Sequence, residues 1–349
     1  MITASREIRN ERFSNAIQAL PQKIPPIWFM RQAGRYHSHY RKLKEKYSFL
    51  ELCKNPHLAA EVALGPIEAF GFDVSILFSD LLFPLEALGM GLEYSPGPKL
   101  SHQLKTEKDI TRLNSLEDAL PQLEFQKKTL QLTKEILPKD VSLIGFLGGP
   151  WTLYTYATSG KHDGNLSFPK TQLGLISLFY EKMIPLLLEN LKLQIEGGAE
   201  LVMIFDTAAG DLDIESFYRL AIEPLKKLCF LYPGKVGYYA KGTTNDQIKY
   251  LDSIPGLAGY GIDHRFDLVE VLKKKQKKGF LQGNFDQSLL FLERKDLNDA
   301  LDIYLNKIKI LTLEQRAGWI SGLGHGILQY TPEDNVKFMV EKIRETLNA

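Results

Sequence analysis

Short apolar runs alternate with longer stretches of helical periodicity along most of the chain. Most of these runs are apolar almost throughout, which is the pattern of strands buried on both faces rather than of half-exposed strands. We count eight: PPIWFM (25–30), VSILFSD (74–80), SLIGFLG (142–148), LVMIFD (201–206), KVGYYA (235–240), GYGID (259–263), FLQGNFD (280–286) and WISGLG (319–324).

The segments between the runs have apolar residues at helical spacing. Residues 177–198 and 301–311 are clear examples, and Gly197-Gly198 ends the first as a helix C-cap does. Eight strands alternating with helices predict a parallel sheet, and eight is the number that closes into a (β/α)8 TIM barrel. A doubly wound open sheet is the competing architecture.

The chain shows no linker rich in Ser and Gly and no short repeat beyond this alternation. We therefore predict one α/β domain over residues 1–349, with its active site at the C-terminal ends of the strands. The segment from about 81 to 140 is longer than one helix requires, so loops or extra helices are expected over one rim of the barrel.

Charge and cysteine content narrow the class of protein. With 44 % apolar residues, 24 % charged residues and a net charge of +1, the chain has the composition of a soluble globular protein, and no nucleic-acid partner is expected. The basic run at 273–278 is interpreted as a solvated helix end. Only Cys53 and Cys229 are present, too few for a disulfide framework, which favours a reducing compartment.

The sequence shows no membrane or targeting signal. No apolar run approaches the roughly 20 residues of a membrane helix. The N-terminus has no apolar leader core, and Glu7 and Glu11 argue against a transit peptide. A cytoplasmic location without membrane contact is therefore predicted.

Polar residues follow most of the apolar runs, where a barrel places its catalytic groups. In chain order they are Arg31, Gln32, Ala33, Gly34 and Arg35 after the first run, Ser79 and Asp80, Tyr154 and Tyr156, Asp206 and Thr207, Asp263, Asn284 to Asp286, and His325 between two glycines.

Taken singly, most of these residues have a structural explanation. An Asp after a strand is often a helix N-cap, which applies to Asp206, Asp263 and Asp286. Tyr154 and Tyr156 could pack at the rim, and a lone His is often a satisfied structural residue. The arginine pair is harder to explain this way, because a guanidinium at the edge of a core needs an anionic partner. Asp80 could be that partner.

Together these side chains indicate an enzyme for an anionic substrate, and a polycarboxylate is the class that we predict. The planar fork of Arg31 and Arg35 suits carboxylate or phosphate, and Asp80 lies in an apolar stretch. No catalytic triad can be assigned from spacing, and neither GxGxxG after the first strand nor GxxxxGK[ST] occurs. Histidines and cysteines are scattered, so neither a metal nor a nucleotide is predicted.

Several blocks of this chain resemble the uroporphyrinogen decarboxylase family. PPIWFMRQAGRY and GFLGGPWTLYTY look like its two signatures, and ILFSD, IFDTAAG, LQGNFD and GLGHGILQYTPEDNV look like further family blocks in the family's order. The resemblance implies a single (β/α)8 barrel, usually homodimeric, that uses no metal or organic cofactor. It also implies the reaction: removal of the four acetate carboxyls of uroporphyrinogen III to give coproporphyrinogen III.

The resemblance also implies roles for particular residues. Asp80 matches the family's central aspartate, which faces the four pyrrole N–H groups, and Arg31, Asp80 and Tyr156 are the implied catalytic residues. Substrate binding is implied for Arg31, Gln32, Ala33, Gly34, Arg35, Asp80, Tyr156, Thr207 and His325. Thr207 falls where many members carry Ser. Either an arginine or His325 could deliver protons, and the sequence leaves this choice open.

Four positions depart from the family pattern. Gly322 stands where Asn is common, Gln329 replaces a frequent Pro, Ser159 replaces an acid and His264 replaces Trp. None of them is an arginine of the first signature, Asp80, Tyr156 or His325, so the implied chemistry is unaffected.

Three other functions compete with the decarboxylase. A methyltransferase of the same superfamily would need a His-x-Cys zinc pair, but Glu51 and Lys227 stand two residues before the cysteines. A non-catalytic polyacid binder would gain nothing from a carboxylate such as Asp80 at the centre of its pocket. A phosphate-binding aldolase would need a Schiff-base lysine at a strand end, for which Lys241 is the candidate.

Overall fold

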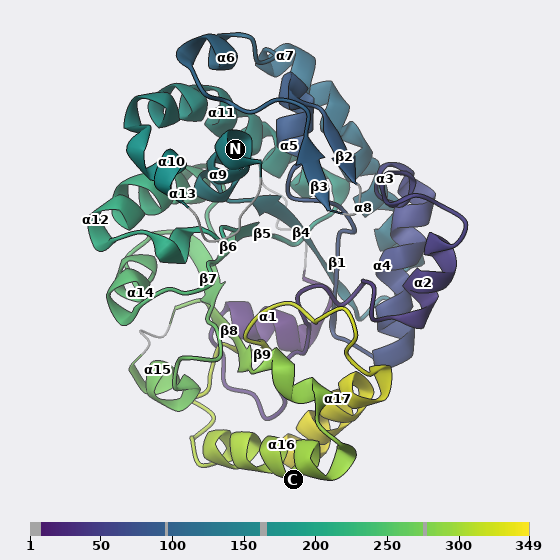
Figure 1. Cartoon of the computed structure of the whole chain (residues 1–349). Coiled ribbons are helices and arrows are strands. Elements are labelled where there is room, and N and C mark those ends of the chain that lie inside the picture. The colour runs from purple at the N-terminus through teal and green to yellow at the C-terminus, as the bar shows by residue number, and fades with distance from the viewer. Residues whose placement is uncertain (1–7, 95–96, 161–165, 275–277, 349) are drawn as a thin grey trace.

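The computed structural model describes residues 8–94, 97–160, 166–274 and 278–348. Its centre is a sheet of seven parallel strands that curls into a ring, with helices around the outside (Figure 1). In sheet order the strands are β1 (Val74–Ile76), β4 (Ser142–Gly148), β5 (Leu201–Phe205), β6 (Val236–Tyr239), β7 (Leu257–Gly261), β8 (Phe280–Phe285) and β9 (Trp319–Leu323).

The first apolar run closes the ring without forming a regular strand. Ile27 makes a parallel bridge to Ser321 of β9, and Asp73, just before β1, donates its N–H to the Ile27 carbonyl (3.0 Å). Pro25 and Pro26 have no N–H to give to a neighbouring strand, which explains why the pairing stays local. All eight predicted runs thus surround one barrel, so the (β/α)8 prediction is confirmed and the open sheet is wrong.

Helices follow most of the strands and cover the outside of the barrel. Those packed around the ring are α4 (Pro56–Phe70), α8 (Glu124–Ile136), α11 (Leu173–Gly197), α13 (Glu223–Leu231), α14 (Asn245–Asp252), α15 (Leu268–Lys274), α16 (Arg294–Lys309) and α17 (Glu333–Asn348). The two helices expected at 177–198 and 301–311 are α11 and α16. Gly198 has φ 114° and ends α11, as the C-cap prediction requires.

Shorter helices occupy the loops and the chain ends. They are α1 (Glu11–Ile17), α2 (Ser38–Lys44), α3 (Phe49–Lys54), α5 (Phe83–Leu85), α6 (Glu107–Thr111), α7 (Leu116–Ala119), α9 (Pro150–Ser159), α10 (Ser167–Thr171) and α12 (Ile214–Phe217). Single turns of tighter or wider helix lie at η1 (Glu86–Met90), η2 (Leu120–Leu123), η3 (Ala209–Asp211), η4 (Tyr218–Ile222) and η5 (Gln287–Phe291).

The barrel interior is apolar, and α1 closes its N-terminal end. Phe13 and Ala16 of α1 belong to the buried cluster that fills the barrel together with Trp28, Val74, Ile144, Met203 and Phe280. Asn10 anchors this helix by donating its N–H to Ser142 Oγ (3.0 Å) at the start of β4. A site open to solvent is thereby directed to the other end, where the strands end.

The long segment between β1 and β4 adds a small rim structure. It contains an antiparallel hairpin of β2 (Leu92–Tyr94) and β3 (Pro98–Leu100), followed by short helices and α8. Extra structure over one rim is what the length of this segment predicted. Of the basic run at 273–278, Lys273 and Lys274 form the last turn of α15, as expected, and residues 275–277 lie outside the described residues.

Both cysteines are buried, and neither is in a disulfide. Over the described residues, no helix has the length and apolar character to cross a membrane.

Candidate active site

The two arginines of the first signature stand at the open end of the barrel without an acidic partner. Arg31 and Arg35 are both exposed, and within the described residues neither has a carboxylate oxygen within ion-pair distance. Arg31 has φ 61°, in the left-handed region that a side chain with a Cβ disfavours by about 1–2 kcal/mol. Such local strain persists only where the surrounding structure holds it in place.

Gln32 and Tyr36 supply this support. The Gln32 side chain is buried, its oxygen accepts the Phe29 N–H (3.3 Å), and its amide donates to the Val74 carbonyl (3.0 Å). The Tyr36 hydroxyl donates to the Gln32 carbonyl (2.8 Å). The Gln32 amide is thus already engaged, and the role its geometry supports is to tie the arginine segment to β1.

The Arg31 side chain lies across the glycine that follows His325. A Cβ built on Gly326 would stand 2.5 Å from Arg31 Cδ and 2.8 Å from Cγ. The glycine therefore provides the space in which the first and last strand ends come together.

Asp80 lies beyond the end of β1 among apolar side chains. Its Oδ1 accepts the Leu82 N–H (2.8 Å), and Phe78 and Leu82 beside it in the chain are buried. Burial raises the pKa of Asp80 above its ordinary value, although the Leu82 bond, the Tyr94 hydroxyl and the charge of Arg31 each lower it. Arg31 thus acts on Asp80 at a distance, and the direct ion pair considered from the sequence does not form.

The two tyrosines of α9 point to different surroundings. Tyr154 is fully buried, and its hydroxyl donates to the Gln172 carbonyl (2.9 Å), so it packs against the barrel as the structural alternative proposed. Tyr156 is only partly buried. Burial raises its pKa, the negative charge of Asp80 raises it further, and Arg31 lowers it. Tyr156 is therefore the tyrosine that lies near Asp80 and Arg31.

Asp206 orients the helix that carries Tyr156. Its Oδ1 accepts both the N–H (2.8 Å) and the hydroxyl (2.7 Å) of Thr152 in the first turn of α9. A Cβ on Gly149 would lie 2.2 Å from Asp206 Cβ, so only glycine permits this approach. Asp206 is thus a helix cap, as one alternative from the sequence held, but it caps α9 rather than the helix that follows its own strand.

This buried carboxylate makes stability depend on pH. Burial raises the pKa of Asp206 to about 6 despite its bonds to Thr152. Because the folded-state pKa exceeds the unfolded one, its contribution to stability is present at low pH and is lost as pH rises through 6. Between pH 4.5 and 7 the wild type should lose about 2 kcal/mol that Asp206→Asn does not. Urea unfolding of both proteins across this range measures the difference, and parallel curves would contradict it.

His325 lies against Tyr239 in the loop after β9. The two rings stack with centroids 5.9 Å apart, and the Tyr239 hydroxyl is 3.2 Å from His325 Nδ1. Burial, and then the positive charges of Arg31 and Lys241, lower the pKa of His325 to about 4. The imidazole is therefore neutral at neutral pH, so it can accept or donate a hydrogen bond but carries no charge of its own.

The remaining polar strand ends mainly brace loops. Asp263 is buried and accepts hydrogen bonds from the Gly242 N–H and from Arg265. Burial raises the pKa of Asp263, but the bonds from Arg265 outweigh burial and hold that pKa below its ordinary value. Asn284 donates to the carbonyls of Asp263 and Phe266, and Asp286 accepts the Ser288 N–H (2.9 Å). Thr207 is partly buried beside Asp206, and Lys241 is exposed.

The departures from the family pattern have separate locations. A Cβ on Gly322 would lie 2.1 Å from Nε2 of the buried Gln282, so that side chain occupies the space next to the glycine. His264 Nε2 is 3.8 Å from Asp286 Oδ2 at the rim. Ser159 ends α9, and Gln329 lines a groove beside Arg35.

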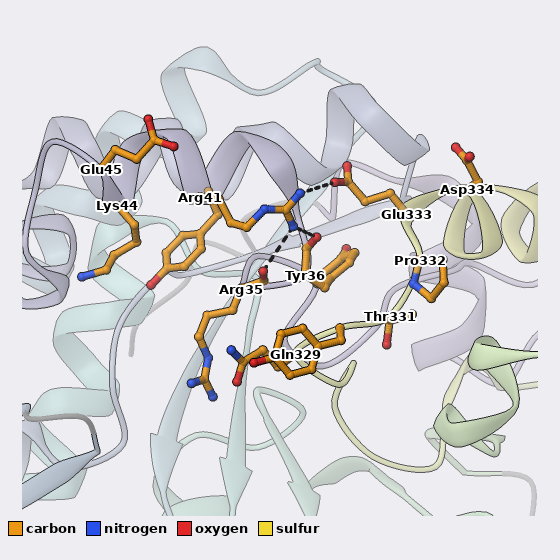
Figure 2. A pocket seen from close by; sticks show the side chains of 12 residues that line it. Arg35, Tyr36, Arg41, Lys44, Glu45, Gln329, Thr331, Pro332, Glu333 and Asp334 are labelled. Atoms are coloured by element: carbon orange, nitrogen blue, oxygen red, sulfur yellow. Dashed lines mark hydrogen bonds and ion pairs between the residues drawn. The ribbon is translucent and has the colours of Figure 1, made fainter.

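That groove extends outward from the arginine segment and has a volume of about 970 Å³. Figure 2 shows Arg35 pointing into it beside Gln329, with Arg41 and Glu333 on the far side. In the part of the chain that the structure describes, no three His, Cys, Asp or Glu side chains lie close enough to hold a metal ion.

One cation links the groups at this end of the barrel. The charge of Arg31 lowers the pKa of four groups that come from four different strand ends: Asp80, Tyr156, Tyr239 and His325. Tyr239 was not foreseen from the sequence, although it lies at the end of the run at 235–240, where the strand-end rule would have found it. The arrangement can hold an anion at Arg31 and Arg35 near the partly buried carboxylate of Asp80.

Comparisons with known proteins show the family of this chain. The family model described as uroporphyrinogen decarboxylase (URO-D) matches residues 8–346. The chain is 36 % identical to a uroporphyrinogen decarboxylase of Campylobacter hominis over 93 % of this chain and 97 % of that one. It is 38 % identical to one of Helicobacter acinonychis (91 % and 94 %) and 33 % identical to one of Chlorobium phaeobacteroides (97 % and 98 %).

Solved structures show the same fold at lower identity. A methyltransferase from Methanosarcina mazei superposes with a TM-score of 0.74 at 19 % identity, covering 97 % of this chain and 98 % of that one. A B12-independent methionine synthase from Shewanella gives 0.53 at 13 % identity, covering 85 % and 90 %. These two establish the fold alone. The family is established by the match along nearly the whole chain and by the curated relatives: this chain belongs to the uroporphyrinogen decarboxylase family.

Proposed function

We propose that this protein decarboxylates the four acetate side chains of uroporphyrinogen III to give coproporphyrinogen III in tetrapyrrole biosynthesis. The observation that carries the proposal is the pair of unpartnered arginines near a partly buried carboxylate, among the described residues at the open end of the barrel. The substrate brings eight carboxylates and a ring of pyrrole N–H groups. Family membership supports the same assignment.

Asp80 has the central part in this reaction. Loss of carbon dioxide from a pyrrole acetate leaves an electron pair that needs an acceptor, and a protonated pyrrole ring provides one. A fixed carboxylate near the ring nitrogens stabilises that cation more than it stabilises the neutral ground state, as catalysis requires. The apolar surroundings of Asp80 strengthen this interaction by lowering the local dielectric. The exocyclic methylene carbon left by this step then takes a proton from solvent or from a side chain and becomes the methyl group, and the ring gives up the proton that it had received.

The other residues of the site hold the macrocycle. Arg31 and Arg35 would bind its carboxylates through their planar forks, with Ala33 and Gly34 shaping the loop between them. Tyr156, Thr207 and the neutral His325 would donate hydrogen bonds to acidic groups of the substrate. The pKa of His325 is lowered to about 4 in the free protein, and carboxylates of the substrate beside it would raise that pKa again, so Arg31, Arg35 and His325 are the candidate proton donors.

The homodimer is proposed on the resemblance, and the location and partners are proposed on the charge, the cysteine content and the apolar pattern of the sequence. We propose a single-domain protein that forms a homodimer in the cytoplasm, with no nucleic-acid or membrane partner. Sedimentation of the purified protein at micromolar concentration measures the assembly, and a monomer of about 40 kDa at every concentration would contradict the dimer.

Product analysis tests the function. Chelator-treated protein is incubated anaerobically with uroporphyrinogen III, and the products are oxidised and separated by chromatography. Porphyrins with seven to four carboxylates are the expected products. Intact substrate that is nevertheless bound would favour a non-catalytic binder, and intact substrate without binding would contradict the proposal.

A further inference from the structure

Glu333, at the start of α17, connects the C-terminal segment to the arginine segment. One carboxylate oxygen accepts the Ser38 N–H (2.7 Å) and the other accepts the Ser38 hydroxyl (3.1 Å), both in the first turn of α2. Glu333 and Ser38 are far apart in sequence. A carboxylate near the C-terminal end of the chain thus holds α2, the helix that follows Arg35.

Arg41 extends this connection to the main chain at Arg35. Its Nη2 is 3.4 Å from Glu333 Oε1, and its Nη1 donates to the carbonyl oxygens of Arg35 (3.3 Å) and Tyr36. Figure 2 shows the guanidinium between Glu333 and these carbonyls, while the Arg35 side chain points away into the groove. One cation thus fixes two consecutive peptide groups at the arginine that we propose to bind substrate.

A second tie joins the same two segments. The Ile327 N–H donates to the Met30 carbonyl (2.9 Å), just before Arg31. Arg31 and Arg35 lie between the two ties on one segment, and Gln329 lies between them on the other. The rim loop carrying the arginines is therefore held at both ends by the segment that follows His325.

The Arg41–Glu333 pair contributes little to global stability. The Arg41 side chain is 53 % exposed and that of Glu333 is 28 % exposed, and exposed pairs typically contribute about 0–1 kcal/mol. Nearby His37 is not an alternative counter-ion, since its Nε2 is 3.8 Å from Glu333 and burial lowers its pKa to about 4. Arg41 is therefore the cation that balances Glu333 at neutral pH.

We propose that Arg41 and Glu333 are positioning residues for substrate binding: together they hold the main chain at Arg35 so that its guanidinium faces the groove and meets a substrate carboxylate. This inference deepens the proposed function and rests on it. Neither residue touches the substrate in this account. Their effect passes through Arg35.

A double-mutant cycle separates this role from direct binding. Arg41→Ala should raise KM for uroporphyrinogen III by about 3- to 10-fold with kcat within twofold, because one ordering contact of the binding loop is lost. In an Arg35→Ala background the same change should have almost no further effect on KM. Additive effects would mean that Arg41 binds substrate directly and would overturn the positioning role.

Glu333 provides the conservative variants. Glu333→Gln keeps an oxygen for the Ser38 N–H and should recover part of the binding that Glu333→Ala loses. Lys42→Ala is the matched control, because Lys42 is an exposed cation on the same helix that lies outside the groove. Its KM should stay within twofold of the wild type. A loss of kcat at unchanged KM in the Arg41 and Glu333 variants would indicate misfolded protein and contradict positioning.

A binding measurement keeps this test independent of turnover. The dissociation constant of the oxidised porphyrin, uroporphyrin III, can be measured by quenching of protein fluorescence in the same variants. Non-additive weakening without wild-type turnover would leave the positioning role standing and remove the decarboxylase. Wild-type turnover with additive or unchanged binding in the variants would support the decarboxylase and contradict the positioning role.

Discussion

Replacing Asp80 by Asn should lower kcat for uroporphyrinogen III by about 100-fold or more and leave substrate affinity within a few fold. The side chains are nearly isosteric, so the shape of the pocket and the bond to the Leu82 N–H can persist. The negative charge that stabilises the cationic pyrrole is lost, and losses of this size follow removal of one transition-state contact. Steady-state kinetics and a porphyrin-binding titration measure the two effects separately.

Asp286→Asn is the matched control for this variant. Asp286 also follows a strand at the open end of the barrel, but its carboxylate accepts the Ser288 N–H and caps a helical turn. Replacing the Asp286 carboxylate by an amide should change kcat by less than about threefold. An Asp80→Asn protein with near-normal turnover would contradict the proposed stabilisation of the cation.

Arg31→Ala should lower kcat/KM by about two orders of magnitude, through both a higher KM and a lower kcat. The charge of Arg31 acts on Asp80, Tyr156, Tyr239 and His325 together, so its loss removes a carboxylate contact and changes the electrostatics of the site. Charge-assisted bonds of this kind contribute about 1.5–3 kcal/mol each.

Arg31→Lys separates the charge from the fork. Lysine keeps the cation but lacks the bidentate geometry, so we expect it to recover part of the loss in kcat and little of the loss in affinity. Thermal unfolding should change little in either variant, since Arg31 is exposed. Kinetics unchanged from the wild type in Arg31→Ala would return this arginine to a structural role.

The barrel could be predicted from the sequence because its strands are buried on both faces. Such strands are continuous apolar runs, and all eight lie around the ring. What the runs could not predict is how regularly each one pairs. Residues 25–30 make only a bridge, because Pro25 and Pro26 lack the N–H groups that a full ladder needs.

The candidate site was predictable in position but not in the use of each residue. Asp80, Asp206 and Asp263 all follow apolar runs, and in sequence they look alike. Asp206 is bonded to Thr152 and Asp263 to Arg265, whereas Asp80 accepts the N–H of Leu82 in its own segment and has the Tyr94 hydroxyl of the rim hairpin nearby. The partners that distinguish them come from other segments, so no local pattern could reveal which carboxylate faces the site.

The sequence did not indicate the site residues that lie outside the strand ends, because their partners also come from other segments. Tyr94 reaches Asp80 from the rim hairpin, and Arg41 of α2 meets Glu333 of α17. The two tyrosines of α9 show the converse. They are two positions apart on a helix, so they must face different surroundings, and the sequence could have favoured one of them without indicating which.

The most direct test of the account is the structure of this protein with coproporphyrinogen III, the proposed product, bound under anaerobic conditions. The account predicts the macrocycle at the C-terminal end of the barrel, with the Asp80 carboxylate within hydrogen-bond distance of pyrrole N–H groups and with Arg31 and Arg35 on its carboxylates. A macrocycle bound elsewhere, or bound there with its pyrrole N–H groups turned away from Asp80, would contradict it.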